Sequence, residues 1–390
     1  MRRKSGVTAF LLLTAFVAPA GAQSDTSRQY IADDEIPYAL LDRPSRFMIG
    51  WPSGALYEGD LMVPIHLFAR TQALRSIANQ NRPYRSSGCS LGQRVHGLQP
   101  AADSSPENPA GWTATGCSLA IIPHVQLRQL SGLSAPVRNP SFNPALEFTW
   151  YRIAVSNNTN ARRMSPEEDR GLLFGWQFRL AHYSNGQSNC LFSSQHVDAA
   201  GNCVPAAKTT DVVNTANGDF STHYVEVGVV LGSIGFAHDD ARVLDGDVEY
   251  IALSERYHPP GLDRWGGMSD DLALVYGRFE TVGHAELRRR YSMGNALGPA
   301  FRYQQQLSLI LDGDYAAQRP SQLGSFNSSV ALALTFPGLY GFGFVARRVS
   351  GWDYYNSGFE NALSNGRAGV AFGIILQHSG ITRFSDPWPK

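Results

Sequence analysis

A histidine and a serine stand two positions apart in the stretch HYSNGQS at 182–188. A serine hydroxyl becomes a nucleophile when a neighbouring base takes its proton and a third group orients that base. On an extended strand, His182 and Ser184 share one face with Cβ atoms about 7 Å apart, a distance that an imidazole can largely bridge. The backbone N–H groups of the tight-turn pair Asn185-Gly186 are candidates for an oxyanion hole. The pair predicts ester hydrolysis, and no G-x-S-x-G elbow of an α/β-hydrolase surrounds Ser184.

The residues before this pair predict a strand with one apolar face. Large apolar residues fill the even positions of 174–180, whereas the odd positions 175–181 hold small or polar residues. Side chains alternate between the two faces of a strand, so His182 and Ser184 continue the apolar face. Most His-x-Ser pairs have no catalytic role. Polar groups on a face that contacts lipid are costly and usually functional, however, and this placement favours an enzyme that acts on lipid.

The third group of the triad is expected on the neighbouring antiparallel strand. The odd positions from Val225 to Leu231 form its apolar face, which places Ser221 and His223 on the same side. The hydroxyl of Ser221 is the candidate to accept a hydrogen bond from the His182 ring. Glu226 is a carboxylate on the same strand, but its even position directs it to the opposite face.

Short alternating segments recur along the chain and predict an all-β fold, an antiparallel transmembrane β-barrel of about 12 strands. A soluble β-sandwich also alternates, but Arg, Gln and Glu in mid-strand indicate a hydrated or hydrogen-bonded barrel interior. The barrel is expected over residues 60–384, after a lead-in at 23–59. Residues 272–280 are a weaker strand candidate. In each of six segments, the large apolar residues occupy alternate positions and so share one face. These segments are Leu61–Leu67, Leu119–Leu127, Leu146–Trp150, Leu307–Leu311, Val330–Phe336 and Val370–Leu376.

The long connections of this barrel are expected at its extracellular end, since outer-membrane barrels have short turns at the other end. They cover residues 71–117, 156–171, 189–218 and 258–270. The direction of the chain then puts the C-terminal end of the 172–184 strand at the extracellular side.

The N-terminus has the features of a cleaved secretory signal over residues 1–22. A basic start precedes a short apolar core at 7–17 and a small-residue cleavage site at 20–22. The formal net charge is 0, with 33 basic and 33 acidic residues, which argues against nucleic acid as a partner. Export predicts a bacterial outer-membrane location.

The four cysteines are expected to form disulfides, because an exported chain enters an oxidising compartment. Of the three pairings, Cys89–Cys117 and Cys190–Cys203 are favoured, since each lies within one long polar loop. A zinc site is the competing interpretation, but the chain has no C-x-x-C spacing.

The stretch HYSNGQS resembles the H-x-S-N-G-x-S signature of the outer-membrane phospholipase A family. A second similarity lies near the C-terminus, in Ser350-Gly351, the segment 353–356, Arg367 and Gly369-Val370. The resemblance covers roughly residues 150–377, mostly at the level of pattern. It implies a twelve-stranded barrel whose site lies on the outer surface near the outer leaflet.

The resemblance gives His182 and Ser184 the roles of catalytic histidine and nucleophile. The third residue of the family is an asparagine three positions before a tyrosine. With Tyr224 as that tyrosine, the asparagine position is Ser221 in this chain. Asn217, four residues away and of the same parity, is the alternative.

The resemblance also implies calcium-dependent activity in a homodimer. The backbone carbonyl of Gln187 would be a calcium ligand, and the amide of Gly186 would be the oxyanion donor. The serine ligand of the family does not carry over, because its position is Phe192, with Ser193 and Ser194 beside it.

The leading hypothesis is therefore an outer-membrane serine esterase of the phospholipase A type acting on membrane phospholipid. A lipid A deacylase shares an H-x-S-N core, but the proteins of that family are much smaller and the third residue of their triad is acidic. A non-enzymatic channel or structural barrel, and a secreted soluble esterase, are the alternatives from other classes.

Overall fold

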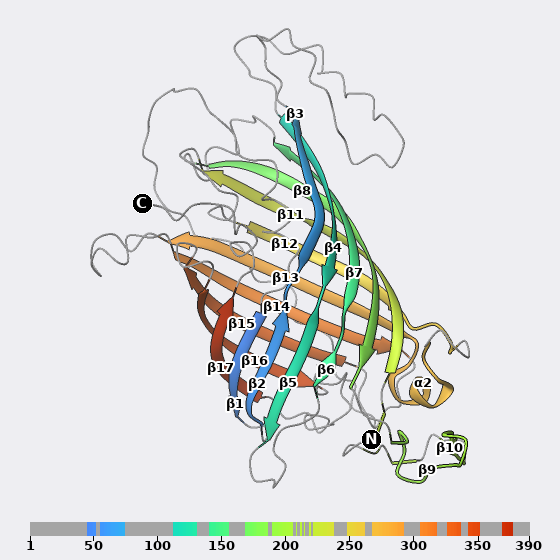
Figure 1. Cartoon of the computed structure of the whole chain (residues 1–390). Coiled ribbons are helices and arrows are strands. Elements are labelled where there is room, and N and C mark those ends of the chain that lie inside the picture. The colour runs from blue at the N-terminus through green and yellow to red at the C-terminus, as the bar shows by residue number, and fades with distance from the viewer. Residues whose placement is uncertain are drawn as a thin grey trace, which may run out of the picture.

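Figure 1 shows the fold of the chain as a computed structural model, with strands that wind obliquely around one axis. The structure describes residues 45–51, 55–74, 112–130, 140–155, 168–185, 189–205, 208, 211–212, 214, 218–219, 221–237, 248–261, 267–291, 305–317, 326–336, 342–351 and 369–376. Among these residues, no helix is long and apolar enough to cross a bilayer.

The described strands form a closed antiparallel barrel, as the alternation predicts. The fifteen strands of the sheet make up twelve barrel-spanning strands, which we call staves, because three of the staves are interrupted once each. The interrupted staves are β2 (Ala55–Met62) with β3 (Ile65–Leu74), β5 (His124–Leu130) with β4 (Trp112–Ile122), and β6 (Ser141–Phe142) with β7 (Ala145–Val155). The other staves are β1 (Ser45–Trp51), β8 (Glu168–Ser184), β11 (Ser221–Ala237), β12 (Val248–Tyr257), β13 (Phe279–Tyr291), β14 (Gln305–Ala317), β15 (Phe326–Phe336), β16 (Phe342–Gly351) and β17 (Gly369–Leu376).

Proline accounts for the three interruptions. Pro64, Pro123 and Pro144 each lie where one stave divides, and proline has no N–H to donate to a neighbouring strand. Backbone hydrogen bonds cross the breaks: Val63 N–H donates to Pro123 O at 3.1 Å, and His182 N–H donates to Pro144 O at 3.0 Å. The line of breaks therefore runs across neighbouring staves and ends beside His182.

A row of buried and partly buried charges crosses five strands of the barrel interior. Glu147, Arg179, Glu226, Arg256 and Glu280 lie directly opposite one another in register on β7, β8, β11, β12 and β13. Arg179 Nε donates to Glu147 Oε2 at 2.8 Å, and Arg256 Nη2 donates to Glu226 Oε2 at 3.0 Å. Alternating signs compensate most of the buried charge, which would otherwise be costly inside the barrel.

The outer surface is apolar and carries exposed aromatic side chains near both ends of the barrel. Outward-facing residues of β8 and β11 are large hydrophobics such as Leu172, Phe174 and Val227. At the end of the barrel that carries Ser184, exposed aromatics lie at the strand ends or within two residues of them. They are Phe142, Tyr257, Phe279, Tyr315 and Phe326. Such an aromatic girdle is typical of barrel surfaces at a membrane–water interface.

A cap of chain packs into the barrel at this end. It contains the short hairpin of β9 (His196–Val197) and β10 (Cys203–Val204) and the helix α2 (Asp270–Tyr276). Apolar residues of the cap form a buried cluster with inward-facing residues of the staves, and they are Leu191, Phe192, Met268, Leu272 and Tyr276.

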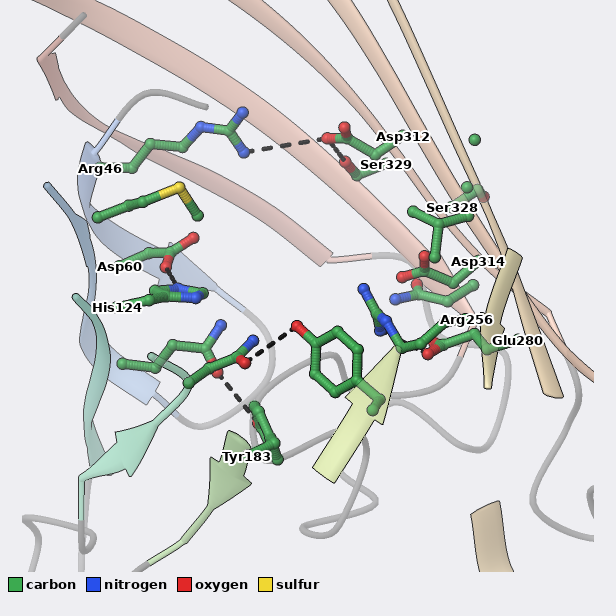
Figure 2. Close-up of a pocket in the computed structure, with 18 of the residues that line it drawn as sticks. Arg46, Asp60, His124, Tyr183, Arg256, Glu280, Asp312, Asp314, Ser328 and Ser329 are labelled. Atoms are coloured by element: carbon green, nitrogen blue, oxygen red, sulfur yellow. Dashed lines mark hydrogen bonds and ion pairs between the residues drawn. The ribbon is translucent and has the colours of Figure 1, made fainter. Parts of the chain in front are cut away.

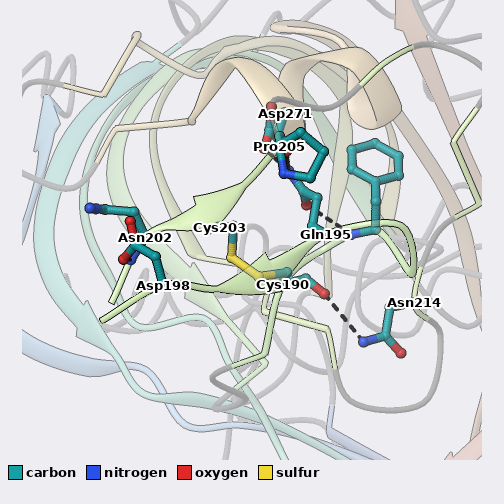
Figure 3. Close-up of a disulfide and its surroundings, with 9 residues drawn as sticks. Cys190, Gln195, Asp198, Asn202, Cys203, Pro205, Asn214 and Asp271 are labelled. Atoms are coloured by element: carbon teal, nitrogen blue, oxygen red, sulfur yellow. Dashed lines mark hydrogen bonds between the residues drawn. A yellow bond between two sulfur atoms is a disulfide. The ribbon is translucent and has the colours of Figure 1, made fainter. Parts of the chain in front are cut away.

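The disulfide Cys190–Cys203 closes the hairpin of the cap, as predicted, and is drawn in Figure 3. Gln195 joins the hairpin to the helix by donating from Nε2 to Asp271 Oδ2 at 2.8 Å. Cys117 is also disulfide-bonded, but its predicted partner, Cys89, lies outside the described residues.

Two sequence-based expectations change. The strands Ser45–Trp51 and Ala55–Met62 belong to the barrel, so it begins within the range 23–59 that was expected to be a lead-in. Residues 270–276 form a helix rather than the start of a 272–280 strand. The Ser269 hydroxyl caps this helix by accepting from Leu272 N at 3.2 Å.

The long connections do not share one end of the barrel. Strands β3 and β7 end at Leu74 and Val155 at one end, whereas β8 and β12 end at Ser184 and Tyr257 at the other. Antiparallel neighbours reverse direction at each connection, so segments separated by a single stave must lie at opposite ends. Of the four long connections that were expected to share one end, only those after β8 and β12 lie at the end that carries Ser184.

We expect the Glu226→Ala variant to lose about 3–5 kcal/mol of unfolding free energy, because it leaves Arg179 and Arg256 buried without their shared carboxylate. The measurement is equilibrium unfolding in detergent micelles, followed by circular dichroism. Glu255→Ala is the matched control, since Glu255 is an exposed carboxylate on β12 that accepts from Thr281. Equal losses in the two variants would contradict the role of the charge row.

Candidate active site

Four polar side chains meet on the outer face of β8 and β11. The antiparallel register pairs Ser184 with Ser221 and His182 with His223. All four are half-buried, and the two pairs occupy successive outward-facing rows. Directly opposite residues of antiparallel strands have Cβ atoms about 5 Å apart, so side chains within each row can touch. We call this group the outer quartet.

The two imidazoles of the outer quartet are in contact. His182 Nδ1 lies 3.3 Å from His223 Nδ1, which is hydrogen-bond range when one nitrogen carries a proton. The ring centroids are 4.7 Å apart, with the planes inclined at 48°. Nδ1 of His182 therefore contacts His223 on β11. This leaves Nε2 as the nitrogen that can accept a proton from Ser184 on the same strand.

Hydrogen bonds tie the chain after Ser184 to the chain before Ser221. The fully buried Asn185 donates from Nδ2 to Gly218 O at 2.8 Å. Asp219 N–H donates to Asn189 O at 2.5 Å. These bonds hold the ends of β8 and β11 together, so Ser184 does not lie at a free end of the sheet. We call the Asn185–Gly218 bond the clamp.

Apolar groups border the outer quartet. On the β6 side, the exposed ring of Phe142 lies opposite Ser184 in register, and Pro144 accepts the His182 amide. The next outward row consists of Leu146, Leu180, Val225 and Tyr257. The quartet is thus a polar island between the aromatic girdle and the apolar wall of the barrel.

The residues between the quartet positions anchor the same strands from inside. Tyr183 donates from its hydroxyl to Gln126 Oε1 at 3.2 Å, and Tyr224 donates to Asn143 Oδ1 at 3.0 Å. Thr222 Oγ1 lies 3.2 Å from His258 Nδ1. These three inward-facing residues are thus fixed in the interior, which restricts the backbone that carries the quartet.

A polar cavity of about 130 Å³ lies inside the barrel behind this wall. Figure 2 shows Arg46, Asp60 and His124 on one side of it and Asp312 and Arg256 on the other. Acidic and basic groups alternate around the cavity: His124 Nε2 bonds to Asp60 Oδ1 at 2.6 Å. Tyr183 and Tyr224 line it as well, so the barrel wall separates the cavity from the outer quartet.

The structure brings together His182, Ser184 and Ser221, the three residues predicted to form a triad. Their catalytic roles stay predictions. The His182 ring contacts His223, which sequence reasoning placed on the correct face but gave no role. Glu226 faces the interior, as its parity indicates. The positions 186, 187 and 217, predicted as oxyanion donor (Gly186), calcium ligand (Gln187) and alternative third residue (Asn217), lie outside the described residues.

A calcium site is implied only by the resemblance, and Gln187, its predicted backbone ligand, lies outside the described residues. No group of three or more His, Cys, Asp or Glu side chains within them is arranged to hold a metal ion. Phe192, at the position where the resemblance expects a serine ligand, is buried in the cap and has no side-chain oxygen. This position does not fit calcium, so we derive no reaction step through the ion, and calcium dependence stays a prediction from the resemblance.

The chain matches no protein-family model, no curated protein and no solved structure. The outer quartet and its surroundings are therefore the basis for a proposed function.

Acid should destabilise the fold through His258, which follows β12 and is buried under the cap. Burial, with the nearby Arg256 and Arg278 guanidinium groups, lowers the pKa of His258 to about 3. An unfolded chain protonates histidine near pH 6.5, so the unfolded state binds more protons between about pH 6.5 and pH 3. Stability from this group is present above that window and is lost as the pH falls through it.

We therefore expect His258→Gln to lose less unfolding free energy than the parent between pH 7 and pH 4. Thermal unfolding in micelles at the two pH values measures the difference. The control is His196→Gln, because His196 is exposed in the hairpin of the cap. A pH dependence that is the same in the parent and both variants would refute this role of His258.

Proposed function

We propose that this protein is an outer-membrane serine esterase that hydrolyses acyl ester bonds of phospholipids at the outer quartet. The observation that carries the proposal is the position of His182 and Ser184. They face outward on an apolar wall, at the level of exposed aromatics. A histidine and serine pair of this kind is otherwise expected in a buried core or in a water-filled cleft. Phospholipid ester bonds lie at this level, between headgroup and hydrocarbon.

In the proposed reaction, His182 Nε2 takes the proton of the Ser184 hydroxyl while Oγ attacks the acyl carbonyl carbon. The tetrahedral intermediate collapses to an acyl-enzyme, and the imidazolium returns the proton to the leaving lysophospholipid oxygen. Water, deprotonated by the same imidazole, then attacks the acyl-enzyme and releases a fatty acid. The amides at Asn185 and Gly186 stay the predicted donors to the oxyanion.

The surroundings of the quartet suit a lipid substrate. Phe142, Leu146, Leu180 and Val225 offer apolar contacts for acyl chains on either side of the polar groups. The channel alternative is less favoured, because the apolar cluster of the cap packs within one end of the barrel and ion pairs cross its interior. A lipid A deacylase would use the same chemistry, and the substrate distinguishes the two enzymes.

The nucleophile assignment predicts that Ser184→Ala leaves the barrel folded but lowers acyl release by several orders of magnitude, since nucleophile and base act as a unit. Fatty-acid release from diacyl phospholipid in mixed micelles is the measurement, with lipid A as the competing substrate. Ser233→Ala is the control, because Ser233 faces outward near the other end of β11. Near-normal activity of Ser184→Ala would end the proposal.

The base assignment predicts that activity falls as the pH is lowered through the range in which His182 becomes protonated. A protonated His182 cannot accept the serine proton. A sulfonyl fluoride should label Ser184 in the parent and far more slowly in His182→Ala, as mass spectrometry of the labelled peptide can report. Equal labelling rates would mean that His182 is not the base.

A further inference from the structure

We propose that His223 is the positioning residue that holds the His182 ring for catalysis, in place of the sequence-predicted Ser221. The inference rests on the proposed esterase function and names a different third member for its triad. It makes the working group Ser184, His182 and His223, with Ser221 as a neighbour of the nucleophile.

The register of β8 and β11 favours His223 over Ser221. His223 is directly opposite His182, whereas Ser221 is opposite Ser184 and reaches His182 only along a diagonal. Diagonal neighbours across a sheet are about 7–8 Å apart, compared with about 5 Å for directly opposite residues, so His223 is the nearer partner for the His182 ring. The contact that the structure contains is between the two imidazoles, at 3.3 Å between their Nδ1 atoms.

The contact is compatible with the tautomers that catalysis requires. To accept the Ser184 proton, His182 must have a lone pair on Nε2 and its hydrogen on Nδ1. That hydrogen then points to His223 Nδ1, which accepts it if His223 carries its own hydrogen on Nε2. When His182 becomes an imidazolium, the same bond becomes charge-assisted and stronger. A contact of 3.3 Å is long, and catalytic hydrogen bonds often shorten when substrate binds.

His223 is itself held in place from inside the barrel. Its carbonyl accepts from Thr222 Oγ1 at 3.0 Å, and Thr222 is fully buried beside His258. Tyr224, on its other side, bonds to Asn143 and lies under Arg256, whose Cζ is 4.5 Å from the ring centroid. Inward-facing residues on both sides therefore fix the backbone that carries the outward-facing imidazole.

Two substitutions separate hydrogen bonding from ring packing. His223→Gln keeps a neutral acceptor but removes the ring, whereas His223→Phe keeps a ring but removes the acceptor. We expect His223→Phe to lower kcat for phospholipid about 10- to 100-fold with little change in KM. His223→Gln should retain most of the activity. The rate of sulfonyl fluoride labelling of Ser184 should fall in the Phe variant in the same proportion, since this small reagent does not depend on lipid packing.

Ser221→Ala serves as the comparison on the same strand and face. If His223 holds the ring, Ser221→Ala should affect kcat much less than His223→Phe. Normal activity of His223→Phe, equal losses in the Gln and Phe variants, or a larger loss in Ser221→Ala would each overturn the inference. Thermal unfolding checks each variant, and His223→Leu replaces the Phe variant if that one does not fold. The esterase proposal itself fails by a different outcome, namely if Ser184→Ala stays active.

Discussion

The row of alternating charges inside the barrel is the interaction on which the rest of the arrangement depends. Glu147, Arg179, Glu226, Arg256 and Glu280 face one another across five strands, and each ion pair requires one particular register. A slip of one residue would turn a buried charge outward and bring an apolar side chain into its place. The same register that pairs Arg179 with Glu226 also sets His182 opposite His223 and Ser184 opposite Ser221. Interior electrostatics thus determine the geometry of the outer surface.

In most enzymes the interior of the fold provides a cleft for chemistry. In this barrel the interior has a structural role, and the candidate site lies on the outer surface. Here the interior contains ion pairs and tyrosine hydrogen bonds that fix the strands of the wall, together with a cavity of about 130 Å³. The outer surface then needs no pocket of its own. Two strands fixed from behind by Tyr183, Thr222 and Tyr224 can present a rigid set of polar groups on their other face.

Period-two alternation made the barrel and its faces predictable, because a closed sheet assigns every second residue to the same side. It placed Ser221 and His223 outside and Glu226 inside without knowledge of any partner strand. It could not supply the register, since the connection from 185 to 220 is too long to fix it. Thus His223 was missed as the partner of His182. The first strand was overlooked because Phe47 and Ile49 alternate only briefly, and the helix could have been found from Ser269 followed by Asp270 and Asp271.

Ser184 and Ser221 form the last rung of the ladder between β8 and β11, which has important consequences for how the site can be lost. Amide-exchange studies of proteins show that terminal rungs open at a small fraction of the global unfolding free energy. Fraying by three rungs would separate all four members of the quartet while the remaining pairs, down to Ala237 and Glu168, stay closed. The clamp between Asn185 and Gly218 lies just beyond this end and opposes such fraying. The lifetime of the assembled site is therefore a local property, set by the hydrogen bonds at this end of the ladder rather than by the stability of the whole barrel.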